Sequence, residues 1–396
     1  MKAFDVAIVG AGPAGSATAI FLLRQGYSVA LIDKQQFPRE KLCGDFVNPA
    51  NWPILRDLGV AETILACRHQ KIMHFGISSC SGDMAEVPLA KAENDCGLSI
   101  RRLDFDFALL QKAKNRGATL FQGCRISGLK RESKGWSLDA DHSGTVDKLG
   151  AQVLIGADGR NSWIAHRLGM ARTRAVQKSS IGFQLRLNSS ISTNGNVEIH
   201  VFDGGYAGVV GLGDGTVTLG FAVEKTRFEE AVTLEYLLRS CLTLNPRLKA
   251  ILQNSQCIGE ARSTYPIYFS PRRSYDERVL LVGDAARVNE PVTGEGIYFA
   301  LKSAELSASA LHRAFKTSDF SAAQLRRYEQ DCRSEFRTRR RINAFVRRLI
   351  YRPPLLSTFI RLSHKRTRLL ESIVQRVCAP DRPSKIRVPS PFAGEG

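Results

Sequence analysis

The chain has 396 residues, of which 43% are hydrophobic and 24% charged, which is enough material for two or three globular domains. No apolar run approaches the roughly 18 residues of a membrane-spanning helix, and the nine scattered cysteines include no C-x-x-C pair that would suggest a zinc site or a redox dithiol. We therefore expect a cytoplasmic protein with reduced thiols and no bound metal.

The N-terminus has the pattern of a strand, a tight turn and a helix. Residues 5–9 form a short, mainly apolar run, and a helical apolar pattern extends to Leu23. Between them stands Gly10-Ala11-Gly12-Pro13-Ala14-Gly15. In this fingerprint the first glycine permits the turn, the second lets the backbone approach a pyrophosphate, and the third lets helix and strand pack closely. The phosphates then lie at the helix N-terminus, where N–H groups and the dipole favour anions.

The next predicted strand, residues 28–32, ends at Asp33, about 20 residues after the glycines, where a carboxylate can bind ribose hydroxyls. These features together predict an adenine-dinucleotide site. The alternatives are an ordinary glycine-rich turn or the apolar core of a secretion signal. Asp5 and the helix-breaking glycines and proline argue against a signal peptide.

Apolar patterns predict further elements along the chain. We expect the end of a helix at 61–66, strands within 71–87, and a helix over 104–115 that stops at Gly117. Strands follow at 118–121, 136–139 and 153–155, and an antiparallel sheet with Asn-Gly, Gly-Gly and Asp-Gly turns spans 181–221. Gly211, Gly213 and Gly215 belong to hairpin turns rather than to a second nucleotide fingerprint, because no helix follows them. After a strand at 279–282 the chain is helical almost to its end.

The net charge of +18 is concentrated near the C-terminus, since roughly two-thirds of it lies after residue 324. Between Arg337 and Leu369, basic and apolar residues alternate in a helical pattern. Such helices either pack on the body with their arginines in solvent or lie on an anionic membrane surface. Nucleic acid is not an expected partner, because nothing resembles a base-reading module.

Two later strand-to-turn junctions each carry an acidic residue among small ones. The strand at 153–155 leads into Gly156-Ala157-Asp158-Gly159, and the strand at 279–282 leads into Gly283-Asp284-Ala285-Ala286 and then Glu290-Pro291-Val292-Thr293-Gly294-Glu295-Gly296-Ile297. With the N-terminal fingerprint, these motifs resemble those of the single-dinucleotide flavoprotein monooxygenases, the para-hydroxybenzoate hydroxylase type, and their geranylgeranyl-reductase-like relatives. The resemblance covers roughly residues 1–310 and implies bound FAD.

The resemblance also implies cofactor contacts. Asp284 takes the place of the acid at the ribitol or pyrophosphate. Gly294, Gly296 and Ile297 belong to the loop whose N–H groups face the pyrimidine end of the isoalloxazine, where a helix N-terminus stabilises negative charge. Glu290 stands where the family often has aspartate. Asp158 belongs to the motif that serves both FAD and the nicotinamide donor, with an ordinary interdomain turn as the alternative.

Two further matches indicate the branch. Lys41-Leu42-Cys43-Gly44 resembles the K-x-C-G segment of the geranylgeranyl-reductase-like group beside the isoalloxazine, and Arg102 with its following helix matches that group's cofactor-binding arginine. Cys43 is a candidate active-site thiol, or else a buried structural cysteine. Gly204 to Val210 stand where true geranylgeranyl reductases have Tyr-x-Trp-x-Phe-Pro and halogenases have Trp-x-Trp-x-Ile-Pro, so neither specialised signature is present. The expected cofactor-binding residues are Gly10, Gly12, Pro13, Ala14, Gly15, Asp33, Lys34, Lys41, Cys43, Gly44, Arg102, Asp158, Gly283, Asp284, Pro291, Gly294, Gly296 and Ile297.

We predict an α/β fold with a Rossmann-like FAD-binding domain (1–72, 100–180 and 258–322), a substrate-binding antiparallel-sheet domain (73–99 and 181–257) and a basic helical C-terminal region (323–396). The resemblance implies an NAD(P)H-dependent monooxygenase that uses O2 and a flavin C4a-hydroperoxide to hydroxylate an apolar or phenolic organic substrate of secondary metabolism. Reduction of prenyl double bonds and FAD-dependent modification of a partner polypeptide are the alternatives. Because the flavin carries the chemistry, no general base is nominated. Cys43, His200 and Tyr206 are the catalytic candidates, and Trp52, His200, Tyr206 and Tyr265 are the candidate substrate residues.

Overall fold

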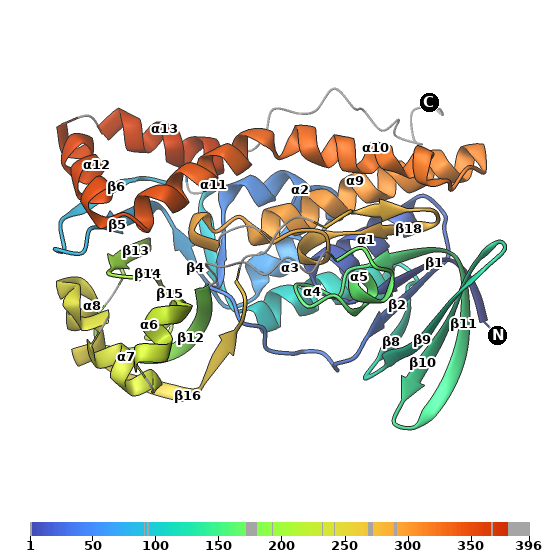
Figure 1. Cartoon of the computed structure of the whole chain (residues 1–396), viewed down its shortest axis with the longest axis horizontal. Helices are drawn as coiled ribbons and strands as arrows, with labels where there is room; N and C mark the ends of the chain where they lie inside the picture. Colours follow the sequence, from blue (N-terminus) through green and yellow to red (C-terminus); the bar gives the residue numbers. More distant parts are fainter. Residues whose placement is uncertain are drawn as a thin grey trace.

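The computed structural model describes residues 2–90, 92, 95–171, 180–191, 193–231, 233–240, 242–267, 272–288, 291–365 and 367–378. Figure 1 shows two sheet regions side by side beneath a long layer of helices. The first region is the predicted dinucleotide domain, and the second is the predicted antiparallel sheet.

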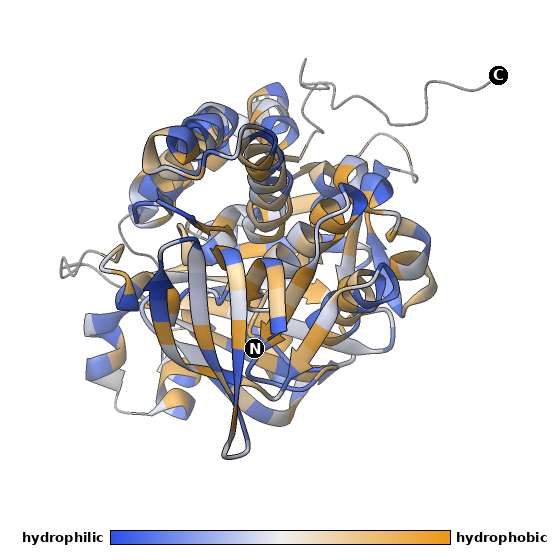
Figure 2. Cartoon of the chain, turned by 90° about the vertical axis from the view of Figure 1, so that its right-hand side faces the viewer, coloured by the Kyte–Doolittle hydropathy of each residue, from blue (hydrophilic) through white to orange (hydrophobic). Residues whose placement is uncertain are grey.

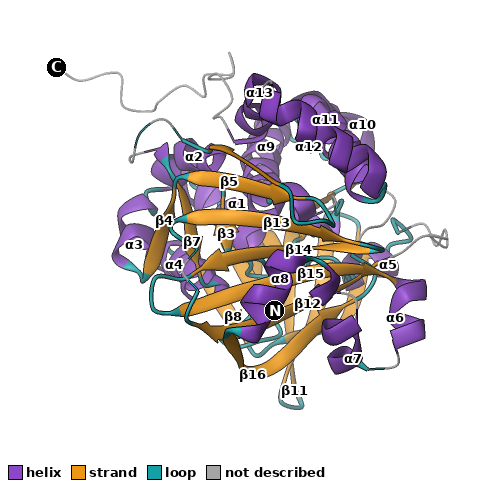
Figure 3. Cartoon of the chain, turned by 90° about the vertical axis from the view of Figure 1, so that its left-hand side faces the viewer, coloured by secondary structure: helices purple, strands orange, loops and turns teal. Residues whose placement is uncertain are grey.

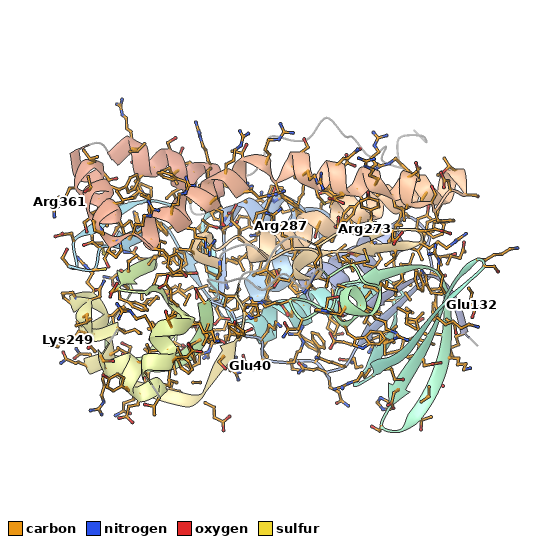
Figure 4. All side chains as sticks on the ribbon, viewed as in Figure 1. Glu40, Glu132, Lys249, Arg273, Arg287 and Arg361 are labelled. Atoms are coloured by element: carbon orange, nitrogen blue, oxygen red, sulfur yellow. The ribbon has the colours of Figure 1, made fainter. Side chains whose placement is uncertain are left out.

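The dinucleotide domain contains an eight-stranded sheet with a parallel centre. Its order is β17-β18-β11-β1-β2-β8, and β10 and β9 extend from β11 as an antiparallel ribbon. The strands are β1 (Lys2–Val9), β2 (Val29–Asp33), β8 (Thr119–Gln122), β9 (Arg125–Glu132), β10 (Gly135–His142), β11 (Thr145–Gly156), β17 (Tyr275–Asp276) and β18 (Val279–Leu281). Figure 4 shows Glu132 at the tip of this ribbon, far from the second sheet.

The central strands are apolar on both faces because both faces are covered. Val6 and Ile8 of β1 pack into the core formed with α1 (Pro13–Arg24), α4 (Arg102–Asn115) and α9 (Gly296–Thr317). Ala7 between them packs on the opposite side with residues of β10, β11 and α5 (Trp163–Arg167). Figure 2 shows hydrophobic residues gathered in the strands and hydrophilic ones along the outer parts of the helices.

The second sheet has seven strands in the order β16-β12-β15-β14-β13-β5-β6. They are β5 (His74–Ser78), β6 (Met84–Pro88), β12 (Ser180–Ser189), β13 (Asn196–Phe202), β14 (Gly205–Gly211), β15 (Thr216–Glu224) and β16 (Ser255–Thr264). Only the β13–β5 pair is parallel. Gly213 and Gly215 lie in the β14–β15 turn, which confirms the predicted hairpin turn for these two glycines, whereas Gly211 is the last residue of β14 and pairs with Val217. A small third sheet has the order β3 (Phe46–Val47), β7 (Gly97–Ile100), β4 (His69–Ile72). Its strands come directly before and after β5 and β6 in the chain.

Helices cover the seven-stranded sheet on both faces. Its outer face packs on α6 (Lys225–Ala231), α7 (Leu234–Ser240) and α8 (Pro246–Gln253). In Figure 3, α8 lies in front of the strands and α6 and α7 lie at their lower right. Its inner face packs on α11 (Arg337–Ile350), α12 (Pro353–Lys365) and α13 (Thr367–Cys378). The remaining helices are α2 (Trp52–Leu58), α3 (Ala61–Ala66) and α10 (Ala322–Glu335). None of the helices described is long and apolar enough to cross a membrane.

The C-terminal helices belong to both regions. Tyr328 of α10 is buried in the dinucleotide core, and its hydroxyl donates to the carbonyl of Leu281 at 2.9 Å. Ile350, Leu356 and Val374, from α11, α12 and α13, pack with the seven-stranded sheet. These helices therefore hold the two sheets together.

Candidate flavin site

The three sequence signatures meet at one edge of the parallel sheet. Strands β18, β11 and β1 are neighbours, and Val9, Gly156 and Leu281 stand in register at their carboxyl ends. The backbone N–H of Ala157 donates to Val9 O at 2.7 Å, and that of Val282 donates to Gly156 O at 2.9 Å. The loops after these strands are thereby fixed side by side, which is where open α/β sheets bind ligands.

The glycines of the first loop have the steric roles that the fingerprint predicts. Gly10 has φ +106°, and a Cβ there would overlap the carbonyl oxygen of Ala157. A Cβ on Gly15 would overlap the carbonyl oxygen of Gly10, so this glycine allows the close contact of helix and strand. Larger residues at either position would push the first loop away from its neighbours.

The N-terminus of α1 is open to an anion. Gly12 is its N-cap, no side chain caps the helix, and no acidic residue lies in its first turn. The Arg39 guanidinium is beside Gly12, with Nη2 3.4 Å from where a Cβ would lie. Free N–H groups, the helix dipole and a guanidinium fit a pyrophosphate. Asp33 lies nearby, where its carboxylate accepts from the backbone N–H groups of Ala11 at 2.8 Å and Gln35 at 2.9 Å.

The second and third loops place two acids on the same cavity. Asp158 Oδ2 accepts from the N–H of Ile164 at 3.1 Å, whereas Oδ1 is buried with no partner among the described residues. Burial raises the pKa of this carboxyl group, against the hydrogen bonds that lower it. Arg272 connects the two loops, because it donates to Arg160 O at 2.8 Å and to Ala285 O at 2.9 Å. A buried carboxylate oxygen without a protein donor, on a residue that lines the cavity, fits a polar ligand that supplies a hydroxyl donor.

Arg102 is fixed by a buried carboxylate. Its Nε and Nη2 donate to the two oxygens of Asp106 at 2.7 and 2.8 Å, one turn later on α4. Arg39 Nη1 approaches the same carboxylate at 3.3 Å. Asp106 is fully buried, so it holds two cavity-lining guanidinium groups in place at once.

Cys43 and Lys41 lie in the same part of the cavity as Arg102. Burial raises the pKa of the Cys43 thiol, although Arg102, which hydrogen-bonds to it, acts in the opposite direction. The Lys41 amine reaches water through the cavity but is surrounded by protein, and this burial lowers its pKa, with Arg102 adding to the effect. The thiol is therefore held in its protonated form.

The direction of a dinucleotide across the site follows from these positions. In a dinucleotide fold, an acid at the place of Asp33 would hold the adenosine ribose, and the α1 N-terminus would hold the pyrophosphate. Asp284, and Gly294, Gly296 and Ile297 at the start of α9, line the same cavity on the side away from β2, where the other half would lie. Pro291 lines it as well. Glu290 lies outside the described residues.

Beyond this end, the cavity of about 1080 Å³ continues into an apolar chamber. Ile199, Tyr206 and Ala222 form its floor on the seven-stranded sheet, and α11, α12 and α13 form its roof. The roof side chains are Phe345, Val346, Leu349, Ile350, Leu356, Phe359, Leu370, Ile373, Val374, Val377 and Cys378. A roofed apolar space next to the flavin half is suited to an apolar substrate.

Most of the predicted cofactor residues line this one cavity, namely Gly10, Gly12, Pro13, Ala14, Asp33, Lys34, Lys41, Cys43, Gly44, Arg102, Asp158, Asp284, Pro291, Gly294, Gly296 and Ile297. Gly15 and Gly283 lie behind the loops and do not line it. Gly283 has φ +56°, and its N–H donates to Ser303 Oγ at 2.9 Å. Of the candidate substrate residues, Tyr206 lines the chamber.

The placement of three other candidates in the pocket is wrong. Trp52 is a core residue whose Nε1 donates to Cys96 O at 2.7 Å. His200 points from β13 to the outer face of the sheet, where its ring nitrogens lie 2.8 Å from Ser78 Oγ and 3.0 Å from Glu198 Oε2. The side chain of Tyr265 is on the surface, 48% exposed.

Sequence reasoning missed several residues of the site. Arg39 and Arg272 carry no motif, and nothing local indicates that they contact the loops. Asp45 is fully buried beside Cys43, with its Oδ2 accepting from Thr218 at 2.9 Å and lying 2.7 Å from Arg186 of the second sheet. Its φ of +53° is unusual for a residue with a side chain and often marks a functional position. The sequence does not show this backbone conformation, so Asp45 could not be nominated from it.

The three loops, the anion-binding helix and the adjoining chamber define the site of an FAD-dependent oxidoreductase. The sequence model of a family described as "FAD binding domain" matches residues 3–204. Conditioned medium factor receptor 1 of Dictyostelium discoideum is 28% identical over 390 residues, covering 89% of this chain and 72% of that protein. Digeranylgeranylglycerophospholipid reductase of Methanocaldococcus jannaschii is 28% identical over 334 residues, covering 83% of this chain and 81% of that protein.

The solved structure of a geranylgeranyl bacteriochlorophyll reductase-like protein from Thermoplasma acidophilum has the same fold, with a TM-score of 0.81 at 22% identity over 97% of this chain and 98% of that one. A menaquinone reductase and halogenases are also among the similar proteins. The chain belongs to the family of flavoproteins with a single FAD-binding dinucleotide domain.

Proposed function

We propose that this flavoprotein reduces carbon–carbon double bonds of a long, prenyl-type apolar chain. The observation that carries the proposal is the chamber, whose α11–α13 roof contributes apolar side chains and one buried thiol. The names of the similar reductases, which act on digeranylgeranylglycerophospholipid and menaquinone, support the same substrate class. NAD(P)H as the electron donor, a cytoplasmic location and contact of the C-terminal helices with a membrane are parts of the proposal that rest on the sequence alone.

The reaction adds one hydride and one proton across the double bond. FAD, when bound in its reduced form, supplies the hydride. Cys43 supplies the proton from Sγ, because burial raises the pKa of its thiol and so keeps it protonated at neutral pH. Arg102, hydrogen-bonded to Sγ, stabilises the thiolate that remains until a proton from water replaces the one transferred.

The hydroxylation predicted from the motifs uses the same cofactor but needs different help from the protein. A phenolic substrate reacts more readily when a base removes its proton. Among the described residues that α11–α13 contribute to the chamber, none is a carboxylate or a histidine. Oxygen insertion is therefore the second outcome that the experiment below detects. Modification of a partner polypeptide stays an untested prediction.

The test is a product mass. Holoenzyme reduced with dithionite under argon is incubated with menaquinone or a geranylgeranyl lipid, and the product gains two hydrogens for each double bond reduced. In air with NAD(P)H, oxygen insertion would instead add one oxygen atom. We expect Cys43→Ala to slow anaerobic turnover more than tenfold while FAD stays bound, and Cys257→Ala, at an exposed thiol, to have no effect. Oxygen incorporation without any anaerobic reduction would contradict the proposal.

A further inference from the structure

A buried ion pair connects the flavin loop to the C-terminal helices. Glu295 directly precedes α9, and Arg339 lies on α11; their side chains are 1% and 2% exposed. Arg339 Nη1 is 3.3 Å from Glu295 Oε1, and the guanidinium carbon is 4.1 Å from the centre of the Tyr298 ring. Arg339 also donates to the carbonyl of Val377 on α13. One side chain therefore contacts the loop, α9 and the chamber roof.

A second link between loop and roof is parallel to the first. Asn343, one turn after Arg339 on α11, donates from Nδ2 to Thr293 Oγ1 at 2.8 Å. The Thr293 hydroxyl in turn donates to Glu295 Oε2 at 2.8 Å. Both oxygens of the Glu295 carboxylate are thus held, and Thr293, Glu295 and Val377 all line the cavity.

The position of Glu295 gives this pair an electrostatic role. α9 is 22 residues long, and its N-terminus, which carries the positive end of the helix dipole, opens on the cavity. A bare carboxylate at this point would cancel that positive potential, since charges interact strongly where water is excluded. The Arg339 guanidinium offsets the carboxylate, so the net potential of the helix end remains. A flavin becomes more negative when it is reduced, so its reduced form gains from that potential.

We propose that Arg339 is a positioning residue through which the C-terminal helices set the reduction potential of the flavin. It keeps the Glu295 carboxylate neutralised and turned away from the flavin, toward α11. The proposal rests on FAD binding and is independent of which substrate occupies the chamber. It also assigns a task to one arginine of the basic C-terminal region that differs from that of its exposed neighbours.

The experiment compares four variants by dye-linked reductive titration of the holoprotein. Arg339→Met removes the positive charge that offsets the carboxylate, so the reduction potential falls by at least a tenfold change in the two-electron equilibrium, about 30 mV. Glu295→Gln removes the negative charge that offsets the guanidinium, so the reduction potential rises by a similar factor. In the double variant, the two-electron equilibrium constant returns to within threefold of the parent value. Arg341→Met, at an exposed arginine on the same helix, changes nothing.

Opposite signs in the two single variants separate this proposal from a merely structural role, which would lower apoprotein melting temperature in both without moving the potential in opposite directions. If Arg339→Met does not fold, Arg339→Lys, which keeps the charge, together with Glu295→Gln decides the question. We expect the Arg339→Lys variant to retain the parent potential despite lower stability. Equal potentials in all FAD-loaded variants, or shifts of the same sign in both single variants, would overturn the proposal.

Discussion

Removal of the Asp106 carboxylate is the sharpest test of how the cofactor site is held together. The side chain is fully buried and bonds both Nε and Nη2 of Arg102, while Arg39 Nη1 lies 3.3 Å away. Asp106→Ala leaves two largely buried guanidinium groups without their shared anion. Breaking a buried pair in this way costs about 3–5 kcal/mol of unfolding free energy. Total stabilities are about 5–15 kcal/mol, so the loss is a large fraction.

The helix offers a matched control two residues away. Asp104 pairs with Arg101 at 3.3 Å, but the arginine side chain is 43% exposed, so Asp104→Ala should cost about 1 kcal/mol or less. Urea denaturation of both apoproteins measures the difference, and fluorescence titration with FAD measures the loss of affinity that follows when Arg102 and Arg39 move. If the two variants unfold within about 1 kcal/mol of each other, Asp106 does not hold the site in the way argued here.

Other substitutions test separate parts of the site. Gly10→Ala should give a colourless protein after FAD reconstitution, because its Cβ would overlap a backbone oxygen at φ +106°, whereas Gly26→Ala, at φ +87° with nothing within 4 Å, should stay yellow. Val374→Trp should raise the KM for a long-chain substrate without changing FAD affinity, since it narrows only the roofed chamber. Burial raises the pKa of Cys43, so iodoacetamide should label it at higher pH than the exposed Cys257, and equal profiles would contradict this. Because the native thiol keeps its proton when the unfolded thiol has lost it, this group's contribution to stability should be complete at neutral pH and fall as pH rises past about 8.5.

The cofactor half of the site could be predicted from sequence because its signals are local. An apolar strand followed by a glycine turn is readable at each of the three loops, whatever the rest of the chain does. The point at which the three loops meet could not be predicted from local signals. β1, β11 and β18 are separated by more than a hundred residues and become neighbours only through the order of strands in the sheet. The family resemblance implied only that the three loops serve one cofactor; the sheet order and the register of Val9, Gly156 and Leu281 come from the structure.

The substrate half could not be predicted from residue type. Successive side chains of a strand point to opposite faces, so Ile199 in the chamber requires that His200 point away from it. The alternation was visible in the sequence, but which face would be covered by α11–α13 was not. Trp52 shows the same limit, because an aromatic ring with one polar atom suits a core position with a single carbonyl partner as well as a binding pocket.

The basic C-terminal helices show why charge patterning alone leaves a role undecided. The sequence indicates an apolar and a basic face on α11, and in the structure the apolar face lies against the apolar chamber, where Val346 and Ile350 line the roof. Arg339 breaks the pattern, because a charge on the buried side is stable only if a partner elsewhere in the fold neutralises it. That partner, Glu295, lies 44 residues earlier at the flavin loop. A buried charge within an otherwise amphipathic helix is therefore the position at which to look for a link between distant parts of a site.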